Sequence, residues 1–172
     1  MRDRGFSLVE LLVTLVVVAI VLAWAVPTFG PTLAATRVTA TTNEIIGALG
    51  SARSLATTKG RGGATLCGTD GPDECDITGN WNSGFMLFAD SNSNGMHEPA
   101  ERIIQVWEPM KAPITLAANT WALTYLPDGS IRSDTPVLFI VCDTSGKVLP
   151  KSVRVWGSGA HSIYSPETCA VP

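Results

Sequence analysis

The feature that most constrains this chain is an apolar run near its N-terminus. From Leu11 to Val26 the sequence has no charged residue, and Thr14 is the single polar side chain. Together with its apolar flanks, from Phe6 to Phe29, the run is long enough to cross the roughly 30 Å hydrocarbon core of a membrane as one helix. We therefore predict a transmembrane helix over residues 6–29.

A short basic leader precedes this run. Residues 1–4 include two arginines, and the positive-inside rule places such a segment in the cytoplasm, with the rest of the chain translocated. A secretory signal peptide is the alternative, because Ala23-Trp24-Ala25 has the small residues of a signal-peptidase site. Glu10 argues against it, since a carboxylate within an apolar run is costly and normally has a dedicated partner.

Residues 5–12, Gly-Phe-Ser-Leu-Val-Glu-Leu-Leu, resemble the prepilin peptidase site of type IV pilins and type II secretion pseudopilins. The resemblance implies cleavage between Gly5 and Phe6 and N-methylation of Phe6. It also implies that Glu10 pairs with the terminal amine of Phe6 on a neighbouring subunit, where a low dielectric strengthens the attraction. Pro27 matches a position at which the family bends its helix, so we expect a kink or local melting near residues 23–27.

Beyond the apolar run, the sequence predicts more helix and then a series of strands. Between Thr32 and Lys59, apolar residues recur at three- and four-residue spacing and form one broad face. These residues are Val38, Ile45, Ile46, Leu49, Ala52, Leu55 and Ala56. After Gly60, short β-type runs alternate with Gly, Pro, Asn and Asp. The predicted strands are 64–67, 84–89, 102–107, 114–116, 121–126, 137–142 and 152–156.

These elements predict an α+β fold, in which a long N-terminal helix, half transmembrane and half amphipathic, packs on an antiparallel β-sheet head. The predicted segments are a leader peptide (1–5), the transmembrane and assembly helix (6–29), the amphipathic half of that helix (30–60) and a β-rich head (61–172). Residues 81–95 with Glu101, and Ala52-Arg53-Ser54, are similar to the FimT/GspH branch of minor pilins and pseudopilins.

The four cysteines indicate the compartment of the protein. They form no C-x-x-C pair and have no clustered histidines beside them, so disulfides fit better than a zinc site. Disulfides imply an oxidising compartment such as the periplasm or the cell surface. Of the three pairings that four cysteines allow, we favour the local one, Cys67 with Cys75 and Cys142 with Cys169; free buried thiols are the alternative. A bond that pins the C-terminal tail is also found in the wider pilin family.

Residues 90–101 fit the calcium-loop pattern D-x-[DN]-x-[DN]-G-x5-E at each specified position. The oxygens would come from Asp90, Asn92, Asn94, the Met96 carbonyl and Glu101. The flanks of this loop are predicted strands rather than helices, however, and His97 stands where such a loop normally has an apolar residue. We therefore favour a structural hairpin loop over a calcium site, and we expect no other cofactor.

No catalytic motif is recognisable, so we do not expect an enzyme. The two histidines, His97 and His161, stand in no Ser-His-Asp or Cys-His pattern. DNA binding is an alternative, since some FimT-like pilins bind DNA through a C-terminal Gly-Arg-x-Arg motif, but residues 151–161 lack it. Arg154 and Trp156 lie on one face of a predicted strand and would contact a phosphate and a base. The net charge of -3 favours an exposed arginine beside a partly buried tryptophan instead, and it argues against DNA as a partner.

The resemblance implies a structural function. The chain would enter the inner membrane as a single-pass protein with a periplasmic head and would be trimmed by prepilin peptidase. An inner-membrane assembly platform would then incorporate it, with other major and minor pilins, into a type IV pilus, where it helps to initiate or cap the fibre. A minor pseudopilin of a type II secretion system, assembled with other pseudopilins, is the second hypothesis, and a DNA-uptake receptor is the third.

Overall fold

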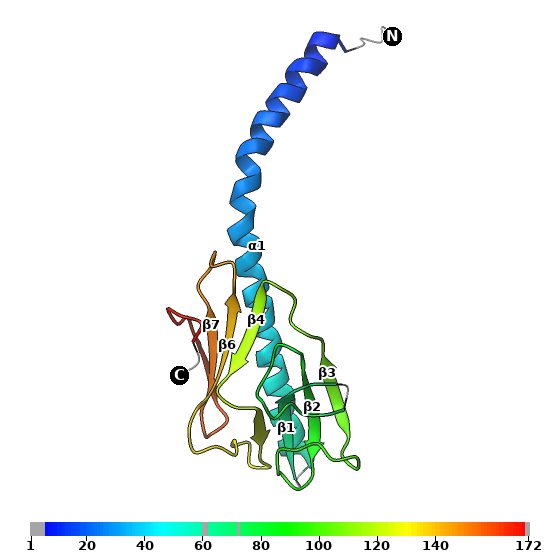
Figure 1. Ribbon diagram of the computed structural model, residues 1–172, viewed down its shortest axis with the longest axis vertical. Coiled ribbons are helices and arrows are strands. Elements are labelled where there is room, and N and C mark those ends of the chain that lie inside the picture. Colours follow the sequence, from blue (N-terminus) through cyan, green and yellow to red (C-terminus); the bar gives the residue numbers. More distant parts are fainter. Residues whose placement is uncertain (1–5, 60–61, 72, 171–172) are drawn as a thin grey trace.

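The computed structural model describes residues 6–59, 62–71 and 73–170, with the backbone alone described for residues 24–29 and for Lys59. Within these residues, one long helix precedes the strands. The elements are α1 (Leu8–Lys59), β1 (Gly63–Gly68), β2 (Phe85–Asp90), β3 (Ile103–Trp107), β4 (Ile114–Ala118), β5 (Ala122–Tyr125), β6 (Val137–Asp143), β7 (Lys151–Val155) and β8 (His161–Tyr164). Figure 1 shows that the first half of α1 projects away from the head, while its second half lies along the strands.

Helix α1 begins after Ser7, which caps it. The amide of Val9 donates to Ser7 Oγ at 3.2 Å, and the amide of Leu11 donates to the Ser7 carbonyl at 3.1 Å. The helix then continues without a break through Pro27 and Pro31 to Lys59. The local melting expected near residues 23–27 is therefore wrong. Figure 1 shows a gentle curve instead, and bending is one way in which a helix accommodates the hydrogen bond that a proline removes.

The strands form two antiparallel sheets rather than the single sheet that we predict from the sequence. Each described sheet has four strands, in the orders β3-β2-β1-β5 and β4-β6-β7-β8. The α+β class, with a helix packed on antiparallel strands, is confirmed. Strand β8 is absent from the predicted set because His161–Tyr164 is a short edge strand whose side chains are mostly exposed.

The second half of α1 forms one wall of the core. Of its predicted apolar face, Val38, Ile45, Leu49, Ala52 and Ala56 are buried, and Ile46 and Leu55 are half-buried against the core. An aromatic cluster joins the two sheets, because the ring of Trp81, just before β2, meets Phe139 of β6 edge to face at 5.0 Å. Beside it, Phe85 and Trp107 stack at 4.6 Å. The helix and both sheets therefore share one core.

Two disulfides close loops at the edges of this core. Cys67 bonds to Cys75 and Cys142 bonds to Cys169, with Cα–Cα distances of 5.6 and 5.9 Å. These are the local pairings favoured by proximity in the sequence, and none of the four thiols is free. The first bond closes the loop after β1, and the second ties the C-terminal tail to β6.

Candidate functional site

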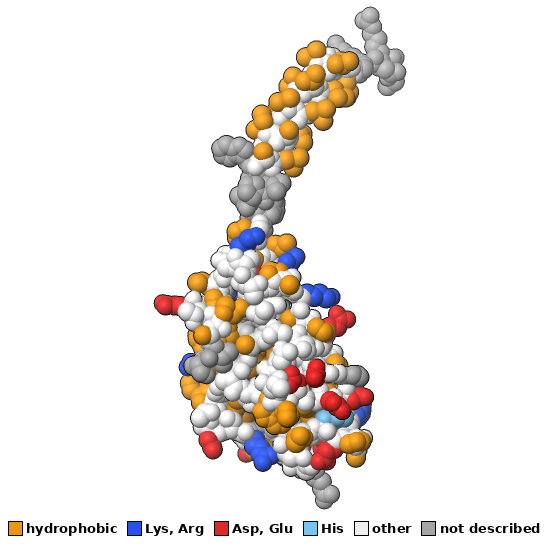
Figure 2. All heavy atoms as spheres, in the orientation of Figure 1, with side chains coloured by type: hydrophobic (Ala, Val, Ile, Leu, Met, Phe, Trp, Pro, Cys, Tyr) orange, Lys and Arg blue, Asp and Glu red, His pale blue; other side chains and the backbone are white. Residues whose placement is uncertain are grey.

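The first half of α1 presents apolar side chains to solvent on every side. Phe6 is 84% exposed, and the large apolar side chains from Val9 to Leu22 are between 49 and 68% exposed. Figure 2 shows this segment, which we call the arm (residues 6–23), as an apolar surface beyond the head. A helix that is apolar all round is stable when lipid or other protein surrounds it. The arm is therefore an interaction surface.

Glu10 is the acidic residue in the first turn of α1, and its side chain is exposed. A negative charge at this position is stabilised by the helix dipole. Ser7 and Glu10 also have the spacing of a capping box, which is a local role that the resemblance to pilins does not suggest. Gly5 and the rest of the leader, 1–5, lie outside the described residues, as does the side chain of Pro27. Cleavage, methylation and the pairing of Glu10 stay predictions.

The membrane crossing predicted for residues 6–29 also stays a prediction. In the part of the chain whose placement is described, no helix reaches both the length and the apolarity that a membrane span requires.

The loop between β2 and β3 holds the predicted calcium ligands, and its first carboxylate is wholly buried. Asp90 accepts hydrogen bonds from Thr65 Oγ1 at 2.7 Å, from the amide of Gly95 at 2.8 Å and from the amide of Asn94 at 3.1 Å. Both oxygens of Asp90 therefore face hydrogen donors that belong to the protein itself.

The second carboxylate of this loop is engaged in the same way. Glu101 accepts from the amide and hydroxyl of Ser91 at 2.6 and 3.0 Å, and from the amide of Glu98 at 3.2 Å. The amide oxygens of Asn92 and Asn94 accept from the backbone two residues on, as in Asx turns. Among the described residues, no group of three or more His, Cys, Asp or Glu side chains is arranged to hold a metal ion. These contacts favour the structural hairpin loop over a calcium site.

The two residues considered for DNA binding are part of an aromatic stack. The guanidinium of Arg154 lies 5.3 Å from the ring centroid of Trp156 and 4.9 Å from that of Tyr164. Cation–π contacts of this kind stabilise the sheet, because the electron-rich faces of the aromatic rings attract the positive charge. Tyr164 belongs to β8, the strand that the sequence pattern does not reveal, so this stack becomes visible only in the folded head.

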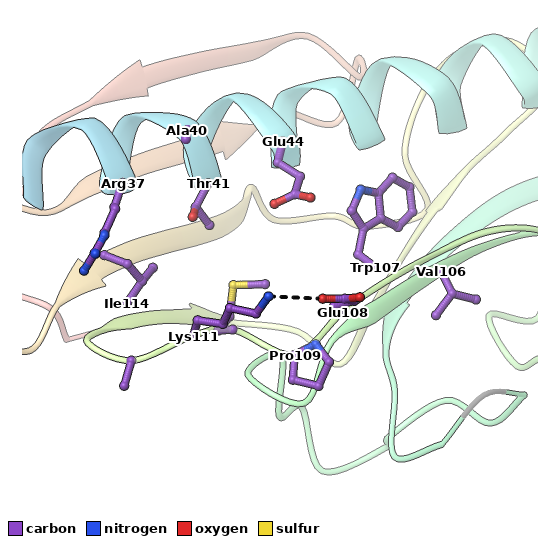
Figure 3. Close-up of a pocket in the computed structure, with 12 residues that line it drawn as sticks. Arg37, Ala40, Thr41, Glu44, Val106, Trp107, Glu108, Pro109, Lys111 and Ile114 are labelled. Carbon is purple, nitrogen blue, oxygen red and sulfur yellow. Dashed lines mark ion pairs between the residues drawn. The ribbon is translucent and has the colours of Figure 1, made fainter. Parts of the chain in front are cut away.

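A groove of about 610 Å³ opens between α1 and the connection from β3 to β4. Figure 3 shows Arg37 and Glu44 reaching into it from the helix, opposite Lys111 of the connection. Lys111 and Glu108 form an ion pair at 3.4 Å, but their side chains are more than 80% exposed, so the pair adds little stability. Arg37 and Lys111 therefore line the same groove.

Arg53 ties the helix to the turn between β7 and β8, and it lies beside the turn after β5. Its guanidinium donates to the carbonyls of Gly159 and Ser158 at 3.2 and 3.1 Å. Gly159 has a φ of 75°, and a side chain there would collide with the Gly129 carbonyl, so the two turns meet backbone to backbone. Arg53 also lies near the hydroxyl of Tyr125, whose pKa is raised by burial to about 12 while the cation opposes the rise.

Comparisons with known proteins identify the relatives of this chain. The family model described as "Type II transport protein GspH" matches residues 41–159, and the model described as "Prokaryotic N-terminal methylation motif" matches residues 1–26. A search of curated proteins found no match.

Two crystal structures of the type IV minor pilin FimU from Pseudomonas aeruginosa share the fold. Each is 16% identical to this chain, and the TM-scores are 0.56 and 0.57. The matches cover 74% and 81% of this chain, respectively, and 96% of each FimU chain. The likeness to FimU shows a common fold, and the GspH match spans more than half of the sequence. The chain therefore belongs to the GspH family of pilin-like proteins.

Proposed function

We propose that this protein is a minor pilin, a structural subunit that is incorporated through its arm into a type IV pilus. The observation that carries the proposal is the arm itself: a helix with exposed apolar side chains from Leu8 to Leu22 that is continuous with a folded head. The GspH family match and the methylation motif support it, because both belong to proteins of this architecture.

On this proposal, prepilin peptidase cleaves between Gly5 and Phe6, and Phe6 becomes N-methylated. The arm lies in the inner membrane until the assembly platform moves the subunit into the fibre, where arms of neighbouring pilins replace the lipid. There, Glu10 would pair with the amine of a neighbouring Phe6, since an unpaired carboxylate in an apolar environment is costly. The head would lie in the periplasm, which is an oxidising compartment and suits the two disulfides.

Mass spectrometry of the mature N-terminus tests the proposal. The chain purified from cells that contain a prepilin peptidase should begin at Phe6 and carry one additional methyl group. Gly5→Val is the matched control, because a branched side chain at the cleavage position should leave the leader attached. A mature chain that begins after Ala25 would mean a secretory signal peptide and would contradict the proposal.

Recovery from sheared surface fibres separates a pilus from a secretion system. A minor pilin should be present in the sheared fraction together with major pilins. A pseudopilin of a type II secretion system would have the same methylated N-terminus, but it should remain with the cells.

A further inference from the structure

The hairpin between β6 and β7 reaches the point where the arm leaves the head. The ammonium nitrogen of Lys147 lies 3.6 Å from the position that a β-carbon on Gly30 would take. Gly30 directly follows the predicted membrane segment, 6–29, and lies one helical turn before Ala34, the first buried residue along the described part of α1. The tip of the hairpin is therefore level with the end of that segment.

Cationic side chains gather at this junction. Lys147 and Arg37 are exposed. Lys151 is half-buried, and its ammonium group donates to Thr39 Oγ1 at 2.9 Å, on another side of α1 from Arg37. Figure 2 shows Lys and Arg side chains on the visible face near the junction, while most Asp and Glu side chains on that face lie farther from the arm. The chain has a net charge of -3, so this local excess of cations differs from the character of the whole molecule.

Asp143 offsets part of this charge. Hydrogen bonds from Ser145, and then the nearby cations Lys147 and Arg37, hold the pKa of Asp143 below its usual value. Asp143 is only 4% exposed, whereas Lys147 and Arg37 are exposed. Arg37 and Lys147 are therefore the charged groups that meet solvent at the junction, while Glu44, an exposed acid in the same groove as Arg37, lies seven residues farther from the arm along α1.

Two large apolar side chains lie beside these cations. Leu149, two residues after Lys147 in the same hairpin, is 68% exposed, and Leu33 of α1 is 52% exposed. Exposed apolar side chains flanked by Lys and Arg are typical of surfaces that lie at a membrane interface. The apolar groups enter the headgroup region, while the long cationic side chains reach the phosphates.

We propose that this junction surface, made by Leu33, Arg37, Lys147 and Leu149, binds the anionic headgroups of the membrane that holds the arm. The contact would keep the head against the membrane before assembly. An anionic phospholipid surface fits because its charge complements the cations and because the junction surface is continuous with the arm. The inference rests on the proposed function, since it requires the arm to lie in the membrane.

The test reconstitutes the full chain in vesicles of phosphatidylcholine and in vesicles in which phosphatidylglycerol replaces a quarter of that lipid. Hydrogen–deuterium exchange of residues 144–150 reports on the hairpin. These amides should exchange more slowly in the anionic vesicles. The difference should disappear at about 1 M salt, where charges are screened within a few ångströms.

Lys147→Gln should reduce the protection in anionic vesicles about fivefold, because each Lys or Arg near an anionic surface contributes to binding by about that factor. Arg102→Gln is the matched control. It removes the same charge from an exposed residue just before β3. Arg102 lies away from the junction, because it is the opposite end of β3, at Trp107, that lines the groove beside Arg37. This control should keep the protection of the parent chain.

The outcomes separate this inference from the proposed function. Flotation of the vesicles in a density gradient shows whether the chain is bound to them. A chain that floats with neither kind of vesicle would contradict the membrane role of the arm. If the chain floats with both but residues 144–150 exchange equally in both, the arm is retained and the junction surface is wrong. Equal loss of protection in Lys147→Gln and Arg102→Gln would also overturn the inference, because overall charge would then explain the effect.

Discussion

At position 90, a buried carboxylate organises the loop between β2 and β3. Asp90 accepts one hydrogen bond from a hydroxyl of β1 and two from amides of its own loop. Hydrogen bonds to an ionised carboxylate are stronger than those between neutral groups. Asp90 therefore holds the loop in place and connects it to the neighbouring strand.

Asp90→Ala should lower the free energy of unfolding by about 2–4 kcal/mol, because it removes three hydrogen bonds and leaves the buried amide of Gly95 without an acceptor. Chemical denaturation of the full chain in detergent, with both disulfides intact, measures the change. Asp70→Ala is the control, since Asp70 is exposed and should alter stability by less than about 0.5 kcal/mol. Equal effects of the two substitutions would show that the buried carboxylate has no special role.

Tyr125 should make stability depend on pH in the alkaline range. Burial raises the pKa of its hydroxyl from 10.0 to about 12, against the opposing Arg53 cation. Between these two values the unfolded chain loses a proton that the folded chain keeps, so stability should fall as pH rises through this window. The total loss attributable to Tyr125 should approach about 3 kcal/mol.

Chemical denaturation between pH 9 and 12 measures this loss, with Tyr125→Phe as the control. Phenylalanine keeps the buried ring but cannot ionise, so the variant should lose correspondingly less stability over the same range. Groups such as lysines titrate in both proteins and cancel in the comparison. Identical pH profiles for the two proteins would contradict the role of Tyr125.

At the scale of elements, the two disulfides constrain loops of different length. Cys67 and Cys75 are 8 residues apart, whereas Cys142 and Cys169 are 27 apart. A disulfide restricts the unfolded chain more when its loop is longer. The bond between β6 and the C-terminal tail should therefore stabilise the head more than the bond after β1.

Replacing both Cys142 and Cys169 with Ala should lower the free energy of unfolding by about 3.5 kcal/mol, and replacing Cys67 and Cys75 by about 2.5 kcal/mol. Cys67 and Cys142 are both buried, so each double variant also loses one buried sulfur, and this packing effect largely cancels. Denaturation midpoints compare the two variants. A larger loss from the shorter loop would mean that packing, and not loop length, decides the order.

At the scale of the whole molecule, we expect the arm to contribute little to the free energy of unfolding of the head. Along the described part of α1, no side chain before Ala34 is buried. A chain that begins at Gly30 should therefore keep the free energy of unfolding to within about 1 kcal/mol when both proteins are measured in the same detergent.

A chain that begins at Ala40 is the matched control for this truncation. It lacks Ala34 and Val38, which are 6% and 1% exposed, and it should lose about 2–4 kcal/mol because part of the core wall is gone. Thermal unfolding followed by circular dichroism distinguishes the two. If the chain from Gly30 fails to fold, the arm contributes to the stability of the head, and this expectation is wrong.

Local patterns in the sequence determined the class of the fold and the position of the arm. The apolar run with Glu10 near its beginning, and the three- and four-residue spacing after Thr32, predict the helix and its buried face. The alternation of short β-type runs with turn residues predicts β1 to β7. These signals are readable because neighbouring residues carry them, and because burial of one face imposes the period of the element.

Only the tertiary structure decided how these elements meet. The division into two sheets, the edge strand β8 and the contact of Arg53 with Gly159, 106 residues away, depend on pairings that leave no local pattern. The calcium-like loop is the clearest case. Its sequence identifies which residues carry oxygens, but a hydroxyl on β1 and the amides of the folded loop decide where the oxygens of Asp90 point. Orientation is a property of three-dimensional packing, and spacing along the chain does not contain it.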